Sequence, residues 1–401
     1  MKVLALNCGS SSLKFRLVGV PQEGGDQAVL SMVIGGEVKG IGGRSSLRLT
    51  IGDAAPQQSQ GVVRHHQQAV QWAFEQLAGQ TIDAVGHRVV HGGESFVESV
   101  RIDTHVLAQI EQLTELAPLH NPLSVIGIRE ARRLLGDQVP MVAVFDTAFH
   151  RSMPAYASTY AIPHVMADHY RIRRYGFHGI AHASVVARYA AFTGRALEHV
   201  RLITLHLGHG CSAAAIRNGR SIDTSMGFTP LEGLVMGTRS GDVDPAIMSY
   251  LGRRQGIQPD NVERMLNEQS GLRGLSGLSD DMAVLLEAER QNHPRAQMAL
   301  EVFCYRVRKY LGAYLVALGG ADAVIFSGGI GEHAPEIRGR ICQDMEWCGL
   351  RLDPERNAAA VGLKDGDIVC LSPDGSGMAA YVVAVDEETE IARETVRCLK
   401  A

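Results

Sequence analysis

Two short turns rich in glycine and serine carry the residue types best suited to binding phosphate. The first runs from Leu6 to Ser11 and the second from Leu207 to Ser212, and a shift of 201 residues matches a leucine, a glycine and a serine in both. Each turn lies between two short apolar runs, which predicts a strand, a tight turn and a strand, twice over. Glycines allow close backbone approach, and successive N–H groups with hydroxyls can surround phosphate oxygens. The pair of turns predicts that the phosphate groups of a ligand are held between the two halves of the polypeptide.

The first half of the sequence predicts a small mixed sheet followed by alternating helices and strands. Apolar residues recur at helical or alternating spacing between glycine-containing breaks. Asn121 is expected to cap a helix that has Pro122 at its first position, and His65 and His66 are expected on a solvated helical face. The expected strands are Ser31–Ile34, Glu37–Ile41, Ser46–Ile51, Ala84–Val90 and Met141–Phe145, and the expected helices are Arg64–Ala78, Thr104–Ala117 and Pro122–Leu135.

The second half repeats this plan. Strands joined by turns are expected from Leu202 to Ile222, and a strand at Ala323–Phe326 is expected to lead into a glycine turn at Ser327–Gly331. The remaining expected elements are helices near Pro245–Arg254 and Gln297–Leu318, a last strand at Met378–Val385 and a final helix at Glu390–Leu399. The duplicated pattern leaves the first domain without a closing element, so we expect the final helix to pack there. The expected domains are 1–150 with 386–401, and 151–385.

Composition excludes several classes of protein. The 401 residues are 45% hydrophobic and 20% charged, as in soluble globular proteins of two or three domains. A net charge of −4 gives no bulk attraction to nucleic acid or to an anionic membrane. No apolar run reaches the roughly 18 residues of a membrane span, and Val3–Leu6 is too short for a signal peptide. Seven scattered cysteines without a CxxC pair indicate reduced thiols in a cytoplasmic protein.

Long motifs along the whole chain resemble those of the acetate kinase family. The two signature segments of that family are matched by Asn7–Phe15 (NCGSSSLKF) and Asp223–Gly233 (DTSMGFTPLEG). Further agreement lies in His87–Gly93, Pro118–Pro122, Phe145–His150, Arg174–Gly179, Gly237–Pro245 and Phe326–Glu332. Motifs of this length are far more specific than a single glycine fingerprint. The resemblance implies a duplicated α/β, ribonuclease H-like fold of the actin, Hsp70 and sugar kinase type, with two domains, a central cleft and usually a homodimer.

The resemblance also implies a reaction and the residues that perform it. The expected reaction is reversible, Mg²⁺-dependent phosphoryl transfer from ATP to acetate, which gives acetyl phosphate and ADP; Mn²⁺ can replace Mg²⁺. Guanidinium groups bind carboxylate and phosphate bidentately, so Arg88 is expected to hold the acid and Arg239, with His178, the transferring phosphoryl group. Asp146 follows a buried strand, where a carboxylate is costly without a partner or a task. Its expected catalytic role is to orient Mg²⁺ or the arginines, and a helix cap or a salt bridge to one arginine is the alternative.

Further site residues follow from the same resemblance. Magnesium prefers oxygen ligands, and Asn7 and Glu387 match the family's metal positions, although Glu387 could simply begin a solvated helix. The acyl pocket is expected to be small and apolar and to contain Val90, Leu119, Phe177 and Pro230. The expected nucleotide-binding residues are Lys14, His206, Leu207, Gly208, His209, Gly210, Asp281, Met282, Ala283, Gly329, Ile330, Gly331, Glu332 and His333.

The chain departs from the common family pattern on the nucleotide side. The usual residues are asparagine at His209, serine at Cys211, arginine at Ala283 and asparagine at His333. Loss of the arginine at Ala283 removes a cation–π contact with a base, on the order of 1 kcal/mol. Either the pocket binds purine less tightly, or the donor is another nucleotide, pyrophosphate or an acyl phosphate.

Three alternative functions remain open at this point. One methylene contributes only about 1–3 kcal/mol of discrimination, so propionate kinase activity is not separated from acetate kinase activity, and butyrate kinase is a more distant match. A sugar kinase or ATPase of the same superfamily would not explain the paired arginines. A regulatory nucleotide-binding protein would be expected to lack Asp146, Arg239 or His178, and all three are present.

Overall fold

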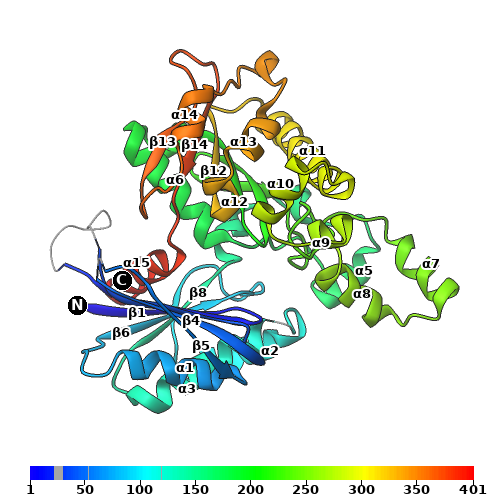
Figure 1. Ribbon diagram of the computed structural model, residues 1–401. Coiled ribbons are helices and arrows are strands. Elements are labelled where there is room, and N and C mark those ends of the chain that lie inside the picture. Colours follow the sequence, from blue (N-terminus) through cyan, green and yellow to red (C-terminus); the bar gives the residue numbers. More distant parts are fainter. Residues whose placement is uncertain (22–29, 53, 119) are drawn as a thin grey trace. The chain divides into compact units, whose positions relative to one another are not determined.

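The computed structural model describes residues 1–401 except 22–29, 53 and 119, and it consists of two compact units (Figure 1). Unit 1 comprises Met1–Phe149 and Asp386–Ala401, and unit 2 comprises His150–Val385. Each unit contains one mixed β-sheet with helices packed on it. None of the helices in the described ranges is both long and apolar enough to cross a membrane.

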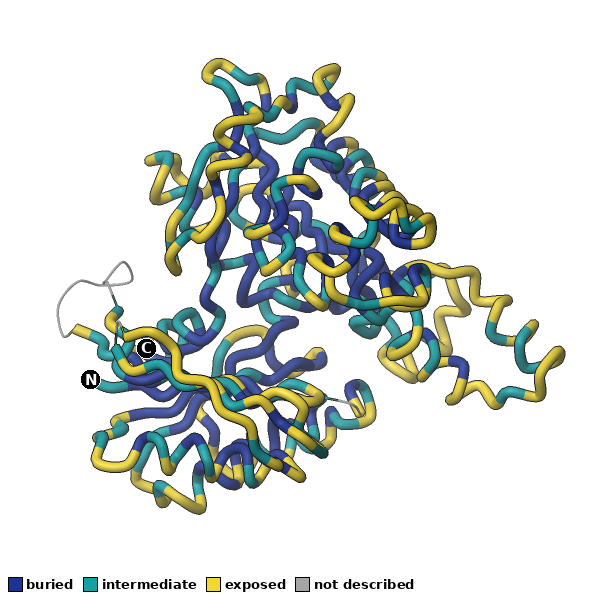
Figure 2. The backbone as a smooth tube through the Cα atoms, in the orientation of Figure 1, coloured by how far each residue is buried: buried dark blue, intermediate teal, exposed yellow. Residues whose placement is uncertain are grey.

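The sheet of unit 1 has the strand order β5-β4-β3-β2-β1-β6-β8-β7. Strand β1 pairs antiparallel with β2 and parallel with β6, and β6 pairs parallel with β8. The central strands are buried along most of their length, whereas β4 is partly exposed and β5 is largely exposed (Figure 2). The strands are β1 (Lys2–Cys8), β2 (Ser12–Gly19), β3 (Ser31–Lys39), β4 (Gly43–Ile51), β5 (Gln57–Val63), β6 (Ala84–Val89), β7 (Val100–Arg101) and β8 (Met141–Phe145).

Helices cover both faces of this sheet. Helices α1 (His66–Gln76) and α3 (Asn121–Leu135) pack together on one face, and α2 (Thr104–Gln112) packs on α3. Helix α15 (Glu387–Lys400) covers the other face over β1, β6 and β8 (Figure 1). Its contact with β6 depends on Gly86, where an added Cβ would lie 2.1 Å from Oγ1 of Thr395. The helix that completes unit 1 therefore comes from the C-terminal part of the chain.

Unit 2 repeats the central topology of unit 1. Its strand order is β11-β10-β9-β12-β14-β13, and β11-β10-β9-β12-β14 has the same relative strand directions as β3-β2-β1-β6-β8. The strands are β9 (Arg201–Leu207), β10 (Cys211–Arg217), β11 (Arg220–Thr224), β12 (Ala323–Ser327), β13 (Ile368–Cys370) and β14 (Ala379–Val383). This repeat is the duplicated α/β fold that the sequence predicts.

Two long helices pack on the sheet of unit 2, α6 (Gly179–Thr193) on one side and α11 (Pro294–Leu318) on the other (Figure 1). The shorter helices of unit 2 surround them and carry several of the expected site residues. They are α4 (Ala155–Ser158), α5 (His164–Tyr170), α7 (Ala246–Gln255), α8 (Pro259–Glu268), α9 (Gly271–Ser276), α10 (Met282–Arg290), α12 (Gly328–His333), α13 (Pro335–Cys342) and α14 (Pro354–Ala359).

Both predicted strand–turn–strand pairs are present, but their turns differ in length. The last pair before the first turn is Cys8 with Leu13, which leaves four residues in the loop. The corresponding pair in unit 2 is Leu207 with Cys211, which leaves three. The shift of 201 therefore matches the turn residues without matching the strand register.

Four local predictions need correction. Asn121 is not a cap but lies inside α3, buried, and the residue before it has no side-chain capping bond. The glycine run after β12 forms the short helix α12 and not an open turn. The final helix begins at Glu387, three residues earlier than expected, because Asp386 caps it through the N–H of Glu388. His66 is buried rather than solvated, and its Nε2 lies 2.7 Å from the carbonyl of Gly9 in the first turn.

The buried His87 in β6 predicts an acid-sensitive core. Within the described residues its Nε2 has no hydrogen-bond partner, and burial, with a smaller contribution from the charge of Arg132, lowers its pKa from 6.5 to about 3. The unfolded chain therefore takes up a proton below pH 6.5 that the folded protein does not, so stability is lost as the pH falls from 6.5 towards 3. We expect His87→Leu to reduce the loss in unfolding free energy between pH 7 and pH 5 by about 2 kcal/mol.

Urea denaturation at both pH values measures this difference. The matched control is His105→Gln, a substitution at an exposed position of α2. Identical pH dependence in His87→Leu and wild type would contradict the assignment of a neutral, buried imidazole.

Candidate active site

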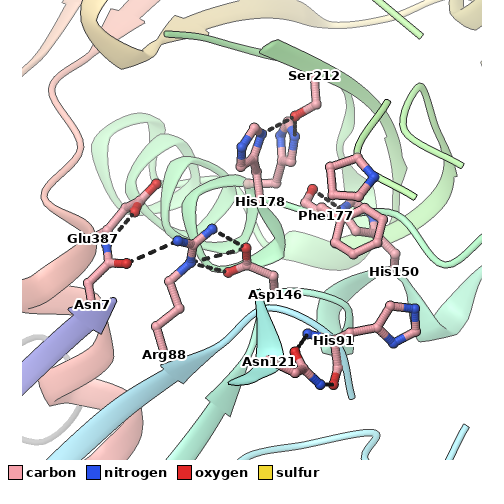
Figure 3. A network of polar contacts seen from close by, with 12 residues as sticks. Asn7, Arg88, His91, Asn121, Asp146, His150, Phe177, His178, Ser212 and Glu387 are labelled. Atoms are coloured by element: carbon pink, nitrogen blue, oxygen red, sulfur yellow. Dashed lines mark hydrogen bonds and ion pairs between the residues drawn. The ribbon is translucent and has the colours of Figure 1, made fainter. Parts of the chain in front are cut away.

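In unit 1, an ion pair between the buried Asp146 and the half-buried Arg88 joins the ends of neighbouring strands (Figure 3). Arg88 comes from β6, and Asp146 directly follows β8, its parallel neighbour. Nε of Arg88 donates to both carboxylate oxygens of Asp146 at 3.0 and 3.1 Å, and its second terminal nitrogen, Nη2, lies 2.5 Å from Oδ2. Nη1 of Arg88 donates to Oδ1 of Asn7 at 3.0 Å. The sequence-predicted trio of Asn7, Arg88 and Asp146 is thus brought together at one edge of the sheet.

The electrostatics of Arg88 favour its charged form. Burial alone would lower the pKa of the guanidinium, but the charge and hydrogen bonds of Asp146, followed by the charges of Glu387 and Glu388, raise it above the usual value. Because Asp146 accepts bonds on one edge, the guanidinium plane is held in a fixed orientation. An arginine fixed in this way can bind a carboxylate without first being ordered.

Oxygen ligands gather around the side chain of Asn7 at the start of α15. Nδ2 of Asn7 donates to Glu387 at 3.2 Å and to Glu388 at 3.0 Å. The described residues contain no cluster of three or more His, Cys, Asp or Glu side chains that could hold a metal by themselves. Asn7 with these two carboxylates nevertheless offers only hard oxygen donors, which suit Mg²⁺ when water and phosphate complete the shell. Glu388, buried beside Glu387, was not singled out from the sequence, where the acidic run offers no way to choose between neighbours.

Lys14 on β2 belongs to the same group of charges. Glu388 raises its pKa, burial opposes this effect, and Glu387 and Glu37 raise it further. Its side chain reaches the surface of unit 1. The structure therefore places this expected phosphate ligand in unit 1, beside the oxygen donors of α15.

A second polar clamp fixes the segment that follows β6. Oδ1 of Asn121 accepts from the N–H of His91 at 3.1 Å, and its Nδ2 donates to the carbonyl of His91 at 3.0 Å (Figure 3). This explains why Asn121 is buried inside α3. The clamp holds the chain next to Val90, an expected acyl-pocket residue that is buried in unit 1. Leu119 lies outside the described residues.

In unit 2, His178 and Arg239 converge on the second glycine turn. His178 has a left-handed backbone conformation (φ 57°) just before α6, which is uncommon for a residue with a side chain. An ideal Cβ placed on Gly210 would lie 3.3 Å from Nε2 of His178 and 3.5 Å from Nη1 of Arg239. Gly210 therefore leaves open the space at which both groups point. Two cationic or hydrogen-bonding groups beside a phosphate-type turn suit the stabilisation of a transferring phosphoryl group.

Hydrogen bonds fix the residues next to these groups. Nε2 of the buried His150 lies 3.0 Å from the carbonyl of Phe177, directly before His178 (Figure 3). Nη1 of Arg239 donates to the carbonyl of Pro230 at 3.3 Å. Of the expected acyl-pocket residues in unit 2, Phe177 is thus buried beside His178, and Pro230 is attached to Arg239 through its carbonyl.

The loop that carries Pro230 and Arg239 has its own polar support. Arg174 donates to Glu232 at 2.5 Å and to the carbonyls of Thr224, Ser225 and Met226 at 3.0–3.1 Å. Tyr310 of α11 donates to Asp242 at 2.9 Å. These supporting residues were not predicted from the sequence, since ion pairs between distant segments leave no local spacing signal.

A pocket of about 370 Å³ lies beside the second turn. Its lining combines apolar side chains from α10 and α12 with polar side chains. It is lined by Gly208, His209, Asp280, Asp281, Met282, Ala283, Leu286, Gly329, Ile330, His333 and Ala334. Eight expected nucleotide-binding residues are among them. Nε2 of His209 lies 3.0 Å from Oδ2 of Asp280, so these two lining residues are joined.

The remaining expected nucleotide residues do not line this pocket: Lys14 belongs to unit 1, and the other five lie in unit 2. Leu207 and Gly331 are buried, and Nδ1 of His206 lies 3.3 Å from Oγ of Ser327. Oε1 of Glu332 accepts from the N–H groups of Gly328 at 2.9 Å and Val385 at 3.3 Å. The carboxylate of Glu332 therefore accepts a hydrogen bond from the first N–H group of its own helix, α12.

Comparisons with known proteins agree with this arrangement. Residues 2–393 match the model of the acetokinase family. The acetate kinase of Chloroherpeton thalassium is 48% identical over 418 aligned residues, which cover 100% of this chain and 99% of the relative. The crystal structure of Porphyromonas gingivalis acetate kinase matches with a TM-score of 0.89 at 39% identity, and a propionate kinase from Francisella tularensis with 0.89 at 35%; both cover 99% of each chain. The chain therefore belongs to the acetokinase family, whose two-sheet α/β fold it shares.

Proposed function

We propose that this protein has the activity of an acetate kinase: it transfers the γ-phosphoryl group of ATP to the carboxylate of acetate, reversibly, and forms acetyl phosphate and ADP. The observation that carries this proposal is the convergence of His178 and Arg239 on Gly210, beside a pocket large enough for a nucleoside. A phosphotransferase needs this combination, because a donor must be held while charge on the moving phosphoryl group is stabilised.

Arg88 is proposed to bind the substrate carboxylate. Acetate is already ionised near neutral pH, so its attack on phosphorus requires no general base. What the reaction requires is that two anions be brought together, and a guanidinium fixed by Asp146 supplies positive charge in a defined orientation. Asp146 accordingly acts as a positioning residue for Arg88.

Arg239 and His178 are proposed to stabilise the transferring phosphoryl group. The in-line transition state spreads negative charge over the equatorial oxygens, and fixed donors aimed at those oxygens lower the barrier. The side-chain-free Gly210 leaves these oxygens room next to both groups.

Asn7, Glu387 and Glu388 are proposed to hold the metal, through oxygen donors that suit Mg²⁺ and also Mn²⁺. When bound, the divalent ion would neutralise phosphate charge and orient the phosphate oxygens. The Nδ2 group of Asn7 must then give up its hydrogen bonds to the two carboxylates, because an N–H donor cannot point at a cation that these carboxylates bind.

ATP is the donor that the pocket favours over pyrophosphate. Met282, Ala283, Leu286 and Ile330 form an apolar lining that an inorganic donor would not need but that a base can contact. Ala283 leaves this contact without the guanidinium surface found in the common family pattern. We therefore propose a nucleotide donor bound with modest selectivity for its base.

Acetate is proposed as the preferred acid because the named relatives at 48% identity are acetate kinases. The structural likeness to a propionate kinase has the same TM-score at slightly lower identity, and a valine at position 90 leaves room for a methyl or an ethyl group. Propionate is therefore the second candidate substrate. A homodimer in the cytoplasm, with no nucleic acid or membrane partner, completes the proposal on the strength of the family resemblance.

A hydroxamate trap tests the function. Purified protein is mixed with Mg²⁺, ATP and acetate, and acyl phosphate is captured with hydroxylamine; we expect a signal with acetate that exceeds the signal with propionate. Parallel reactions replace ATP with pyrophosphate, or omit Mg²⁺. A signal only with pyrophosphate would overturn the nucleotide donor, and no signal with any donor or short acid would overturn the proposed activity.

A further inference from the structure

A chain of buried hydrogen bonds leads away from His178 into the core of unit 2. Nδ1 of His178 lies 2.9 Å from Oγ of Ser212 (Figure 3). The same oxygen lies 2.8 Å from Nε2 of His182. Nδ1 of His182 lies 2.7 Å from Oγ1 of Thr204. Ser212, His182 and Thr204 are all fully buried, whereas His178 is half-buried.

Three secondary-structure elements position this chain. His178 is the residue before α6 and His182 is the fourth residue of this helix, and both rings lie within hydrogen-bond distance of one oxygen, Oγ of Ser212. Thr204 belongs to β9 and Ser212 to β10, and these paired strands present both hydroxyls to α6. Ser212 therefore does not use its hydroxyl to hold phosphate, as the glycine- and serine-rich turn suggests. It joins two imidazoles.

The chemistry of the groups limits how protons are distributed along the chain. Burial, with smaller contributions from His150 and His206, keeps the pKa of His182 well below its ordinary value, so this ring is neutral. A neutral imidazole has one N–H donor and one acceptor nitrogen, and a hydroxyl donates a single proton. A hydroxyl oxygen can accept two hydrogen bonds, but if Ser212 accepted from both imidazoles its own buried proton would be without an acceptor, which is unfavourable. The three hydrogen bonds are therefore expected to point the same way, either towards His178 or away from it.

Thr204 decides between the two directions. Within the described residues, Nδ1 of His182 is the hydrogen-bond partner of the Thr204 hydroxyl. If the chain pointed away from His178, Thr204 would accept from His182 and its own proton would be buried without an acceptor, which is unfavourable. If the chain points towards His178, Thr204 donates to His182, His182 donates to Ser212, and Ser212 donates to Nδ1 of His178. Every buried donor then has an acceptor.

We propose that Thr204, His182 and Ser212 are positioning residues that fix the tautomer of His178, by donating to Nδ1 so that the proton of the neutral ring stays on Nε2. Nε2 is the nitrogen that faces Gly210 beside Nη1 of Arg239. The chain thus presents an N–H donor, rather than a lone pair, to an anionic phosphoryl group. This inference deepens the proposed function and rests on it only for the identity of the group that accepts the hydrogen bond.

Other charged and titratable groups surround His178 without replacing this role. The ring of His206, from β9, lies 4.9 Å from the ring of His178 and 6.3 Å from that of His182. The ring of His150 lies 5.6 Å from that of His182. These rings and the guanidinium of Arg239 lie near the chain, whereas the hydrogen bonds that form it join Nδ1 of His178 and both nitrogens of His182 to the hydroxyls of Ser212 and Thr204.

Two substitutions at Thr204 test the proposal. Thr204→Val removes the hydroxyl at nearly constant shape, and Thr204→Ser keeps it. We expect Thr204→Val to lower kcat by about tenfold with little change in KM for acetate or ATP, as for the loss of a remote orienting partner, and Thr204→Ser to restore most of the rate. ¹⁵N spectra of protein labelled at histidine report the tautomer of each ring directly. The signals of His178 are assigned as those that are missing from the spectrum of His178→Gln.

Each outcome decides the question. Wild type with a protonated Nε2 and a bare Nδ1 at His178, and a mixed tautomer in Thr204→Val, would support the proposal. A proton on Nδ1 in wild type, or equal spectra and rates for the two Thr204 variants, would overturn it. If Thr204→Val does not fold, Ser212→Ala gives the same comparison by removing the hydroxyl that contacts Nδ1 of His178 directly. The spectra need no turnover, so a failure of the proposed kinase activity remains distinguishable from a failure of the hydrogen-bond chain.

Discussion

Replacement of Arg239 with alanine is expected to lower kcat by roughly 10³-fold or more, since an arginine at the transferring phosphoryl group accounts for an effect of that size. Nη1 of Arg239 lies against Gly210, at the place that Nε2 of His178 also faces. An interaction made mainly in the transition state lowers kcat more than it raises KM. Steady-state rates with saturating ATP and varied acetate measure this split.

The controls separate charge from geometry. Arg239→Lys keeps one positive charge but loses the planar fork, and we expect it to recover only part of the rate. Arg253→Ala removes an exposed arginine in the last turn of α7 and serves as the matched surface variant. A near-normal kcat in Arg239→Ala would remove this residue from the catalytic machinery. A large rise in KM for acetate alone would move it to substrate binding.

Replacement of Asp146 with asparagine is expected to affect both activity and stability. The carboxylate accepts three hydrogen bonds from Arg88, and an amide would turn a donor towards the same guanidinium. Leaving a buried charge without its partner costs about 3 kcal/mol of unfolding free energy. Because Arg88 would lose its fixed orientation, we expect kcat/KM for acetate to fall by roughly 10²-fold.

The pattern of kinetic loss distinguishes the two roles considered for Asp146. If it orients Arg88, the KM for acetate rises and the Mg²⁺ concentration needed for half-maximal rate stays close to that of wild type. If it instead orients the metal, the Mg²⁺ requirement rises and acetate binding is spared. Asp137→Asn is the matched control, because that carboxylate is 85% exposed.

The sequence predicts most of the helices and strands, but not the residues at which they begin and end. A continuous apolar run located β8, whose five residues are all buried, and buried apolar residues recur along the predicted helix α11. It missed β5, since Gln57–Val63 is an exposed edge strand whose polar residues carry no apolar alternation. It also began the final helix too late, because the acidic residues of its first turn resemble a loop. In fact they are favoured there by the helix dipole.

The site residues could be predicted where they belong to a sequence motif. Their hydrogen-bond and ion-pair partners could not be predicted. Arg88 and Asp146 stand out by their glycine-rich or buried settings, but their mutual pairing depends on which strands are adjacent. Asn121 has the sequence position of a cap, and only the packing of α3 under the segment after β6 turns it into the clamp of His91. Likewise Ser212 lies in a phosphate-type turn, and the face of β10 on which it lies directs it to two histidines.

The origin of α15 has a consequence for synthesis of the chain. This helix covers β1, β6 and β8, yet residues 150–385 must be translated between the last strand of unit 1 and α15. At about 5–20 residues per second, that interval lasts roughly 10–50 s on the ribosome. During it, the apolar surface around Val3, Val18 and Ala84, which α15 later covers through Ala392 and Val396, has no native partner. Unit 2 can fold as it emerges, whereas unit 1, although first to be made, is last to be completed, and nascent chains stalled before residue 386 would be expected to bind chaperones through that surface.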